Sequence, residues 1–236
     1  MDRDILIVPD IHGRDFWLPA LDYKGEIIFL GDYTDPYPAE GFTDEDSYQI
    51  LLKVIKFKQE NPDRVTLLIG NHEMHYYNKY MAAGRFSYDY YDKFNELLTN
   101  EATKDLFQVC KKVDKYLFIH AGIIKKWYDL HYNDFKDCGS NLEEQLNNAF
   151  FSKMHIFYEA SRYRYGIDDA GSPLWADGRE LYDEKEKGEH FDPEIIQIVG
   201  HTPVLKPDPL IEKNFWLVDN KKLYLLHNNA LEKYIR

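Results

Sequence analysis

The sequence predicts an α/β fold. Five short apolar runs have the length and the flanking turn residues that are typical of buried strands, and each is followed by a residue that can bind a metal ion. Apolar residues at helical spacing lie between some of these runs, as in residues 48–55. In open α/β sheets, ligands bind beyond the carboxyl ends of the strands, so the run ends predict a shared site. The runs are residues 5–8, 26–30, 65–69, 115–119 and 194–199.

Composition limits the class of protein. The chain has 236 residues, 44% of them hydrophobic, and a net charge of −12. The hydrophobic share argues against disorder, and the acidic charge argues against nucleic acid as a partner, because a phosphate backbone needs a basic surface. Cys110 and Cys138 have no metal-type or redox-type spacing, and no signal peptide follows Met1, so a cytoplasmic location is expected. No run approaches the roughly 20 apolar residues of a membrane span, and no linker divides residues 1–236, so one domain without a membrane partner is expected.

The first run leads to Asp10 and His12. Alternation in an extended segment places these two side chains on the same side. A carboxylate and an imidazole are a suitable pair for a divalent transition metal. Taken alone, this pair also fits an ordinary loop at a strand end.

The second and third runs are each followed by a glycine and then by a polar residue. Gly31 lets the backbone turn and present Asp32, and Gly70 precedes Asn71 and His72. Asn71 can offer its carbonyl oxygen to a metal or cap the next helix. His72 can donate a proton to a leaving group.

The fourth and fifth runs end at histidines, His120 and His201. Arg162 and Arg164 stand among tyrosines and fit either a clamp for an anion or a solvated helix end. The remaining segments have weaker patterns. They predict helices at 89–99 and 101–111, a charged mobile excursion at 178–190, and a closing hairpin of 215–219 and 222–227.

The five run ends together resemble the ordered signatures of the calcineurin-like metallophosphoesterases. They are more similar to the phosphoprotein phosphatase branch, which includes bacterial Ser/Thr phosphatases and symmetrical diadenosine tetraphosphatases. The motifs span residues 10 to 203. They read Asp10-Ile11-His12-Gly13, Gly31-Asp32-Tyr33-Thr34-Asp35, Gly70-Asn71-His72-Glu73, His120-Ala121-Gly122 and Gly200-His201-Thr202-Pro203.

The resemblance implies a sandwich of two mixed β-sheets flanked by α-helices, with two divalent metal ions at the loops after the strands. Manganese is expected, with Fe, Zn, Ni or Mg as alternatives. The resemblance also implies that both ions share Asp32. The implied ligands are Asp10, His12 and Asp32 for one ion, and Asp32, Asn71, His120 and His201 for the other.

The implied activity is hydrolysis of phosphate monoesters by attack of a metal-bound hydroxide, in the manner of a protein Ser/Thr phosphatase. His72, fixed by Asp35, would protonate the departing oxygen, and the carboxylate beside it predicts a charged imidazole near pH 7. The expected partner is a phosphorylated protein or a small phosphate ester. Two alternatives stay open: hydrolysis of nucleotide-type phosphoanhydrides or phosphodiesters, for which tyrosine-rich segments 76–91 and 158–165 offer stacking faces, and a metal-binding scaffold without turnover.

Three positions depart from the resemblance, and one of them is Pro9, which stands where the first motif begins with a glycine. The phosphatase branch has arginines where this chain has Pro36 and Ile69. A phosphate dianion needs cations to orient it, so either another arginine substitutes or the substrate is bound differently. The candidates are Arg14, Arg162 and Arg164.

Overall fold

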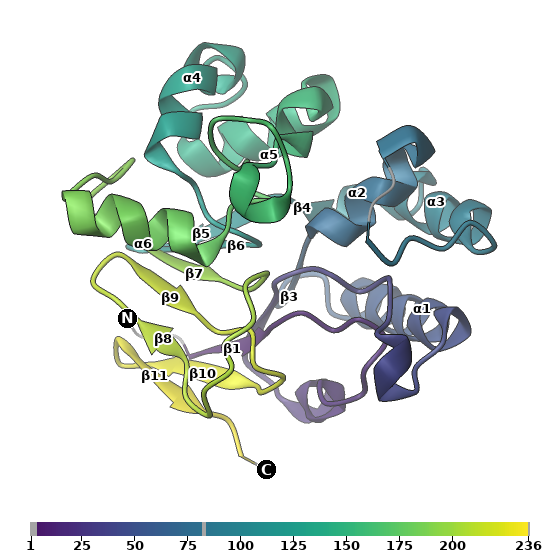
Figure 1. The fold of residues 1–236 in the computed structure, drawn as a ribbon. Coiled ribbons are helices and arrows are strands. Elements are labelled where there is room, and N and C mark those ends of the chain that lie inside the picture. The colour runs from purple at the N-terminus through teal and green to yellow at the C-terminus, as the bar shows by residue number, and fades with distance from the viewer. Residues whose placement is uncertain (1–3, 82–83, 236) are drawn as a thin grey trace. The chain divides into compact units, whose positions relative to one another are not determined.

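The computed structural model describes residues 4–81 and 84–235. Its contacts divide the chain into two compact units: unit 1 is Met1–Gln108 with Lys221–Arg236, and unit 2 is Val109–Asn220. Figure 1 shows the ribbon coloured along the chain. Residues 82 and 83, inside the tyrosine-rich segment 76–91, lie outside the described residues. The single domain over 1–236 stays a prediction.

The described part of unit 1 contains a mixed sheet of six strands (Figure 1). The first three predicted runs form adjacent parallel strands in it, so their carboxyl ends meet at one edge. On the other side of β1 (Ile5–Val8), β10 (Tyr224–His227) pairs in the antiparallel sense, with Ile5 opposite Leu226. In sheet order the strands are β11 (Ala230–Lys233), β10 (Tyr224–His227), β1 (Ile5–Val8), β2 (Glu26–Phe29), β3 (Val65–Leu68) and β4 (Phe107–Gln108).

The described part of unit 1 also contains three α-helices: α1 (Asp44–Glu60), α2 (Asn71–Tyr77) and α3 (Tyr91–Thr99). Thr43 begins α1 by accepting a hydrogen bond from the backbone N–H of Asp46, whose carboxylate accepts the N–H of Thr43 in return. The helix buries Leu51 and Val54, and it contacts β3 and α3. The predicted helix at 89–99 is confirmed, because residues 91–99 form α3.

The described part of unit 2 contains a second mixed sheet. The fourth and fifth predicted runs form its adjacent parallel strands β6 (Tyr116–Ile119) and β7 (Ile196–Val199), with Ile119 opposite Val199. His120 and His201 thus follow neighbouring strands, as predicted. In sheet order the strands are β5 (Cys110–Val113), β6 (Tyr116–Ile119), β7 (Ile196–Val199), β9 (Phe215–Leu217) and β8 (Leu210–Ile211).

The α-helices of unit 2 are α4 (Lys125–Phe135), α5 (Leu142–Ser152) and α6 (Gly178–Lys187). The predicted mobile excursion at 178–190 is wrong, because most of it is α6. Asp177 caps this helix by accepting the backbone N–H of Arg179, and Glu180 accepts the N–H of Asp177. Leu181 of the same helix is buried, so one apolar side chain packs this otherwise charged helix into the fold.

Two further expectations differ from the structure. The predicted helix at 101–111 is wrong, because its second half forms β4 and the beginning of β5. The predicted closing hairpin is also wrong: β9 pairs within the sheet of unit 2, whereas β10 pairs with β1 and β11 in unit 1. Asn228 and Asn229 form the turn between β10 and β11. Both asparagines have the positive φ that such tight hairpin turns require.

Of the described residues, no helix combines the length and apolar character needed to cross a membrane.

Candidate active site

The loops after β1 and β2 hold predicted site residues in strained backbone conformations. His12, Asp32 and Asp35 have φ values of 46°, 52° and 54°, in the left-handed region that side chains rarely adopt. Such conformations cost on the order of 1–3 kcal/mol each and cluster at functional sites. The backbone N–H groups of Ile11 and His12 both donate to the carbonyl of Asp32, which joins the two loops.

Two glycines let the loops after β2 and β3 touch. A Cβ built on Gly31 would lie 2.5 Å from the backbone nitrogen of Gly70. A Cβ on Gly70 would lie 2.1 Å from Oδ1 of Asp32. No side chain fits at either contact, so the glycine before each polar motif is required by the close approach of the two backbones.

Glu73 fastens these loops together from α2. Its two carboxylate oxygens accept the backbone N–H groups of Asp32 and Gly70, both at 2.9 Å. They also accept the N–H groups of Tyr33 and Thr34, at 2.8 and 3.1 Å. Burial raises the pKa of Glu73, but donors from the backbone favour its ionised form. Sequence reasoning assigned Glu73 no role.

We expect Glu73→Gln to lower the free energy of unfolding by about 2–3 kcal/mol, because the amide nitrogen would face buried N–H donors. Urea unfolding of the metal-free protein measures this loss. Glu60→Gln is the matched control, since Glu60 is exposed at the end of α1. A change of less than about 0.5 kcal/mol, the usual range for surface substitutions, would contradict the role assigned to Glu73.

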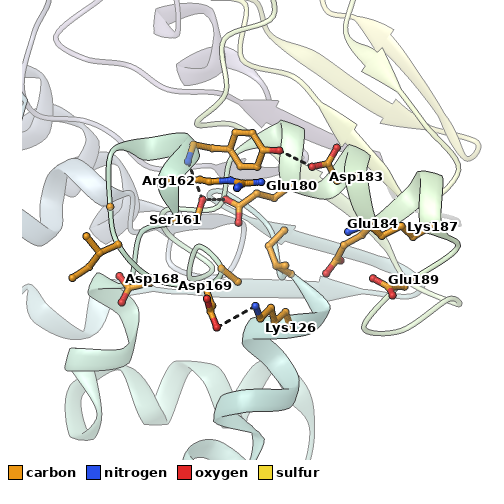
Figure 2. A pocket seen from close by; sticks show the side chains of 15 residues that line it. Lys126, Ser161, Arg162, Asp168, Asp169, Glu180, Asp183, Glu184, Lys187 and Glu189 are labelled. Atoms are coloured by element: carbon orange, nitrogen blue, oxygen red, sulfur yellow. Dashed lines mark hydrogen bonds and ion pairs between the residues drawn. The ribbon is translucent and has the colours of Figure 1, made fainter.

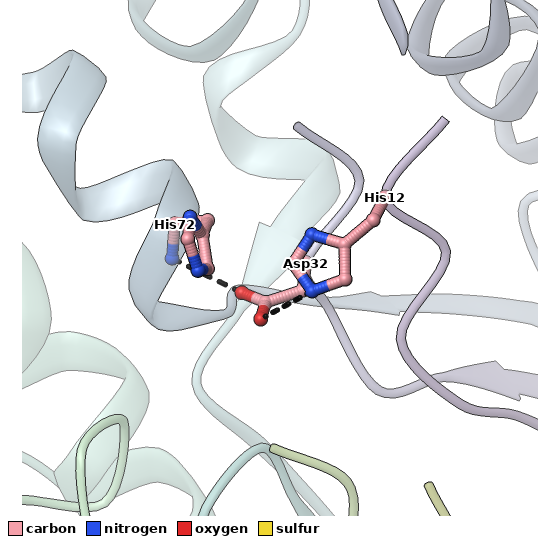
Figure 3. Close-up of side chains that lie close together, drawn as sticks. All are labelled: His12, Asp32 and His72. Atoms are coloured by element: carbon pink, nitrogen blue, oxygen red, sulfur yellow. Dashed lines mark hydrogen bonds and ion pairs between the residues drawn. The ribbon is translucent and has the colours of Figure 1, made fainter. Parts of the chain in front are cut away.

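His12, Asp32 and His72 place one nitrogen or oxygen each within 4.8 Å of one another, and all three are buried (Figure 3). Nε2 of His12 lies 3.3 Å from Oδ2 of Asp32. Nδ1 of His12 lies 2.9 Å from the carbonyl of Thr34 and therefore donates to it, which leaves Nε2 as the electron-pair donor. Oδ1 of Asp32 accepts the backbone N–H of His72 at 3.0 Å.

This donor set fits a divalent transition metal, because a fixed imidazole nitrogen and a carboxylate oxygen face one another. Asp10 and Asn71 are also buried, at 2% and 4% exposure. Asp10 follows β1, and Asn71 is the first residue of α2. Gly70 is the cap of that helix, so Asn71 is not needed for capping.

Asp35 lies at the centre of a buried cluster beside this group. Oδ2 of its carboxylate accepts Nδ1–H of His72 at 2.6 Å and lies 3.2 Å from Nδ1 of His75, and the hydroxyl of Tyr76 donates to Oδ1. Burial alone would raise the pKa of Asp35, but these hydrogen bonds hold it well below its usual range. Asp35 is therefore an anion that fixes the orientation of the His72 ring.

Burial lowers the pKa of His72, and the carboxylates of Asp32 and Asp35 compensate for this only in part. The direction is opposite to the expectation of a charged imidazole at neutral pH, which considered the neighbouring carboxylate and not the burial of the ring.

In unit 2, His120 and His201 lie together. Nε2 of His120 is 3.1 Å from Nδ1 of His201, and both side chains are buried. His201 has a φ of 57°, so it shares the left-handed backbone of the site residues in unit 1. The two imidazoles form a second pair of nitrogen donors suited to a transition metal.

The predicted substrate arginines have other partners. Arg14 donates to both carboxylate oxygens of Glu40, at 2.6 and 3.1 Å, and these hydrogen bonds lower the pKa of Glu40 to about 2. Arg164 forms an ion pair with Asp177 at 2.9 Å and donates to the carbonyl of His201. Their role at phosphate stays a prediction.

Arg162 lines a pocket of about 500 Å³ in unit 2 (Figure 2). The lining has more acids than cations, which does not suit a phosphate dianion. The acids are Asp168, Asp169, Glu180, Asp183, Glu184 and Glu189, and the cations are Lys126, Arg162 and Lys187.

The sequence model of calcineurin-like phosphoesterases matches residues 4–205. This chain belongs to the calcineurin-like phosphoesterase family. The catalytic subunit of serine/threonine-protein phosphatase 4 from Eremothecium gossypii is 31% identical over 137 residues. That match covers 56% of this chain and 39% of the relative, and the same subunit from Saccharomyces cerevisiae matches over the same shares at 31% identity. The chain thus spans well under half the length of these relatives.

Solved structures confirm the fold. A cold-active protein-tyrosine phosphatase of a psychrophilic Shewanella species has a TM-score of 0.58 at 17% identity, covering 98% of this chain and 77% of that one. A serine/threonine phosphatase from Saccharomyces cerevisiae with similarity to human phosphatase PP5 has a TM-score of 0.55 at 15% identity, covering 99% and 80%. Two mixed sheets with flanking helices are the expected fold class, and this expectation is confirmed.

Proposed function

We propose that this protein is a metal-dependent phosphate monoesterase of the protein Ser/Thr phosphatase type. The observation that carries the proposal is the oriented His72–Asp35 pair directly beside the facing His12 and Asp32 side chains. Family membership and the protein phosphatase relatives support it. The chain's acidic charge agrees with a substrate other than nucleic acid.

In this proposal the site would hold two divalent ions, with manganese as the first choice, which would supply Lewis acidity toward phosphoryl oxygens and water. The proposed ligands are those inferred from the sequence: Asp10, His12, Asp32, Asn71, His120 and His201. Asp35 holds Nδ1–H of His72, and in the protonated imidazole the other ring nitrogen carries a second proton, which it would donate to the departing oxygen. Glu73 keeps the backbone around Asp32 in place.

A substrate panel tests the proposal. We expect the Mn²⁺-loaded protein to hydrolyse p-nitrophenyl phosphate and a phosphoserine peptide faster than bis(p-nitrophenyl) phosphate or diadenosine tetraphosphate. Chelation of the metal should stop turnover, because the side chains of the site include no activated nucleophile in this mechanism. Preference for the bis-ester or the dinucleotide would favour the second enzyme class. Tight Mn²⁺ binding without any turnover would support a scaffold.

A phosphoprotein partner and a cytoplasmic location are parts of the same proposal. They rest on the protein phosphatase relatives and on the low cysteine content of the chain.

A further inference from the structure

Arg85 comes after α2 in the chain. Its side chain is held against the loop that carries Asp35. Its Nε donates to the backbone carbonyl of Asp35 at 2.9 Å. Its guanidinium carbon lies 3.6 Å from the ring centroid of Tyr37, so the planar group is stacked on an aromatic face. The hydrogen bond and the stack together fix the guanidinium before any ligand binds.

The far end of this guanidinium lies between two histidines of the site. Nη2 of Arg85 is 3.4 Å from Nε2 of His72 and 3.3 Å from Nδ1 of His12. Only the first of these contacts can be a hydrogen bond from Arg85, because Nδ1 of His12 already donates to Thr34. It forms while Nε2 of His72 is unprotonated and is given up when that nitrogen carries the proton for the leaving group. Nε2 of His72 is the ring nitrogen that the proposed function turns toward the leaving group. Arg85 therefore marks the place where a phosphate ester would meet that nitrogen.

The charge of Arg85 has no carboxylate partner among residues 4–81 and 84–235. This separates it from Arg14, which stacks on the same Tyr37 ring at 4.7 Å but is neutralised by Glu40. A fixed guanidinium without a carboxylate partner of its own, next to histidines suited to a cation, favours the binding of an anionic ligand.

Arg85 can also be reached by a ligand. It lines a groove of about 700 Å³ in unit 1, together with the rings of Pro36, Pro38, Phe42 and Phe86. Asp44 and Asp89 also line this groove, so only its end at the guanidinium suits an anion. The Arg85 side chain is half-buried, so part of the guanidinium faces this groove. An incoming phosphate ester could place its phosphate on Arg85 and the rest of the molecule along the groove.

We propose that Arg85 binds the substrate phosphate and takes the place of the arginines that Pro36 and Ile69 replace. The proposal rests on the proposed function, and it adds to this function a residue that was not among the arginines selected from the sequence. Guanidinium is the group best suited to two oxygens of one phosphate, because its donors form a rigid fork.

Calorimetric titration of the Mn²⁺-loaded protein with inorganic phosphate tests this assignment without needing turnover. We expect Arg85→Ala to weaken phosphate binding about 10- to 100-fold, as for the loss of a hydrogen bond between charged groups. The KM for p-nitrophenyl phosphate should rise by a similar factor, and the Mn²⁺ content should not change. Arg85→Lys should lie between wild type and Arg85→Ala, because it keeps the charge and loses the fork. Lys93→Ala is the control, since it removes a cation stacked on Tyr90 in the surface of α3.

Wild-type phosphate affinity in Arg85→Ala would overturn the assignment, as would a parallel loss of Mn²⁺ in both Arg85 variants. A larger loss in Arg14→Ala than in Arg85→Ala would transfer the role to Arg14. If the wild type binds phosphate through Arg85 and hydrolyses no ester, the proposed function fails and the phosphate site stands.

Discussion

Asp32→Asn is expected to abolish hydrolysis and to remove both metal ions. Asn keeps an oxygen that can accept the backbone N–H of His72, so the loop should fold as before. It loses the negative charge that two cations would share, and a loss of several kcal/mol in transition-state stabilisation corresponds to about 10³–10⁴ in rate. Metal analysis after dialysis against Mn²⁺ and steady-state kinetics measure the two effects.

The comparison with His12→Ala sharpens this test. Loss of His12 should weaken mainly one ion, whereas loss of the Asp32 charge should weaken both. Asp63→Asn, at an exposed turn before β3, controls for the change in net charge. Full retention of both ions in Asp32→Asn would show that Asp32 is not the shared ligand.

His72→Ala is expected to slow hydrolysis of a phosphoserine peptide by about 10²–10⁴ and to affect p-nitrophenyl phosphate much less. An alkoxide is a poor leaving group that needs a proton, and p-nitrophenolate leaves with little help. Asp35→Asn should show the same bias more mildly, because it leaves the imidazole in place but orients it less well. The ratio of kcat/KM for the two substrates is the measurement.

Metal content must be measured in the same variants, since Asp35 also binds His75 and Tyr76 and its loss reaches further than the His72 ring. His155→Ala is the control, because His155 is exposed in unit 2. Equal losses of kcat/KM on both substrates would contradict the general-acid role and leave His72 as a positioning residue.

The strands that carry the site could be predicted because each is marked by local chemistry. An apolar run between turn residues identifies β1, β2, β3, β6 and β7 without knowledge of their partners. The strand β5 carries Lys111 and Lys112 and pairs only with β6 at a sheet edge, so it has no such run. The α6 helix was missed because it also lacks an apolar run. The spacing of Asp177 and Glu180 is nevertheless that of a capping box, which indicates the start of a helix.

Pairing between distant segments lies beyond such local patterns. Phe215–Leu217 and Tyr224–His227 are close in sequence, and neighbouring strands usually pair, yet these two belong to different sheets. Glu73 and Arg85 were missed because they act on backbone groups of other loops, and such contacts leave no trace in the residue types. For Arg85 one signal existed: with arginines missing at Pro36 and Ile69, each remaining arginine was a candidate.

The pairing of Ile5 with Leu226 has a consequence for the folding of the chain during its synthesis. The ribosome makes β1 before unit 2, and it makes the whole of unit 2 before β10. Until then β1 has a parallel neighbour on one edge and bare N–H and C=O groups on the other, directly before the loop with Asp10 and His12. Unit 2 can complete its sheet from one continuous stretch, whereas unit 1 waits for a late strand. The nascent chain therefore exposes this unpaired strand edge, which can pair with another chain, beside the loop with Asp10 and His12 until β10 has been made.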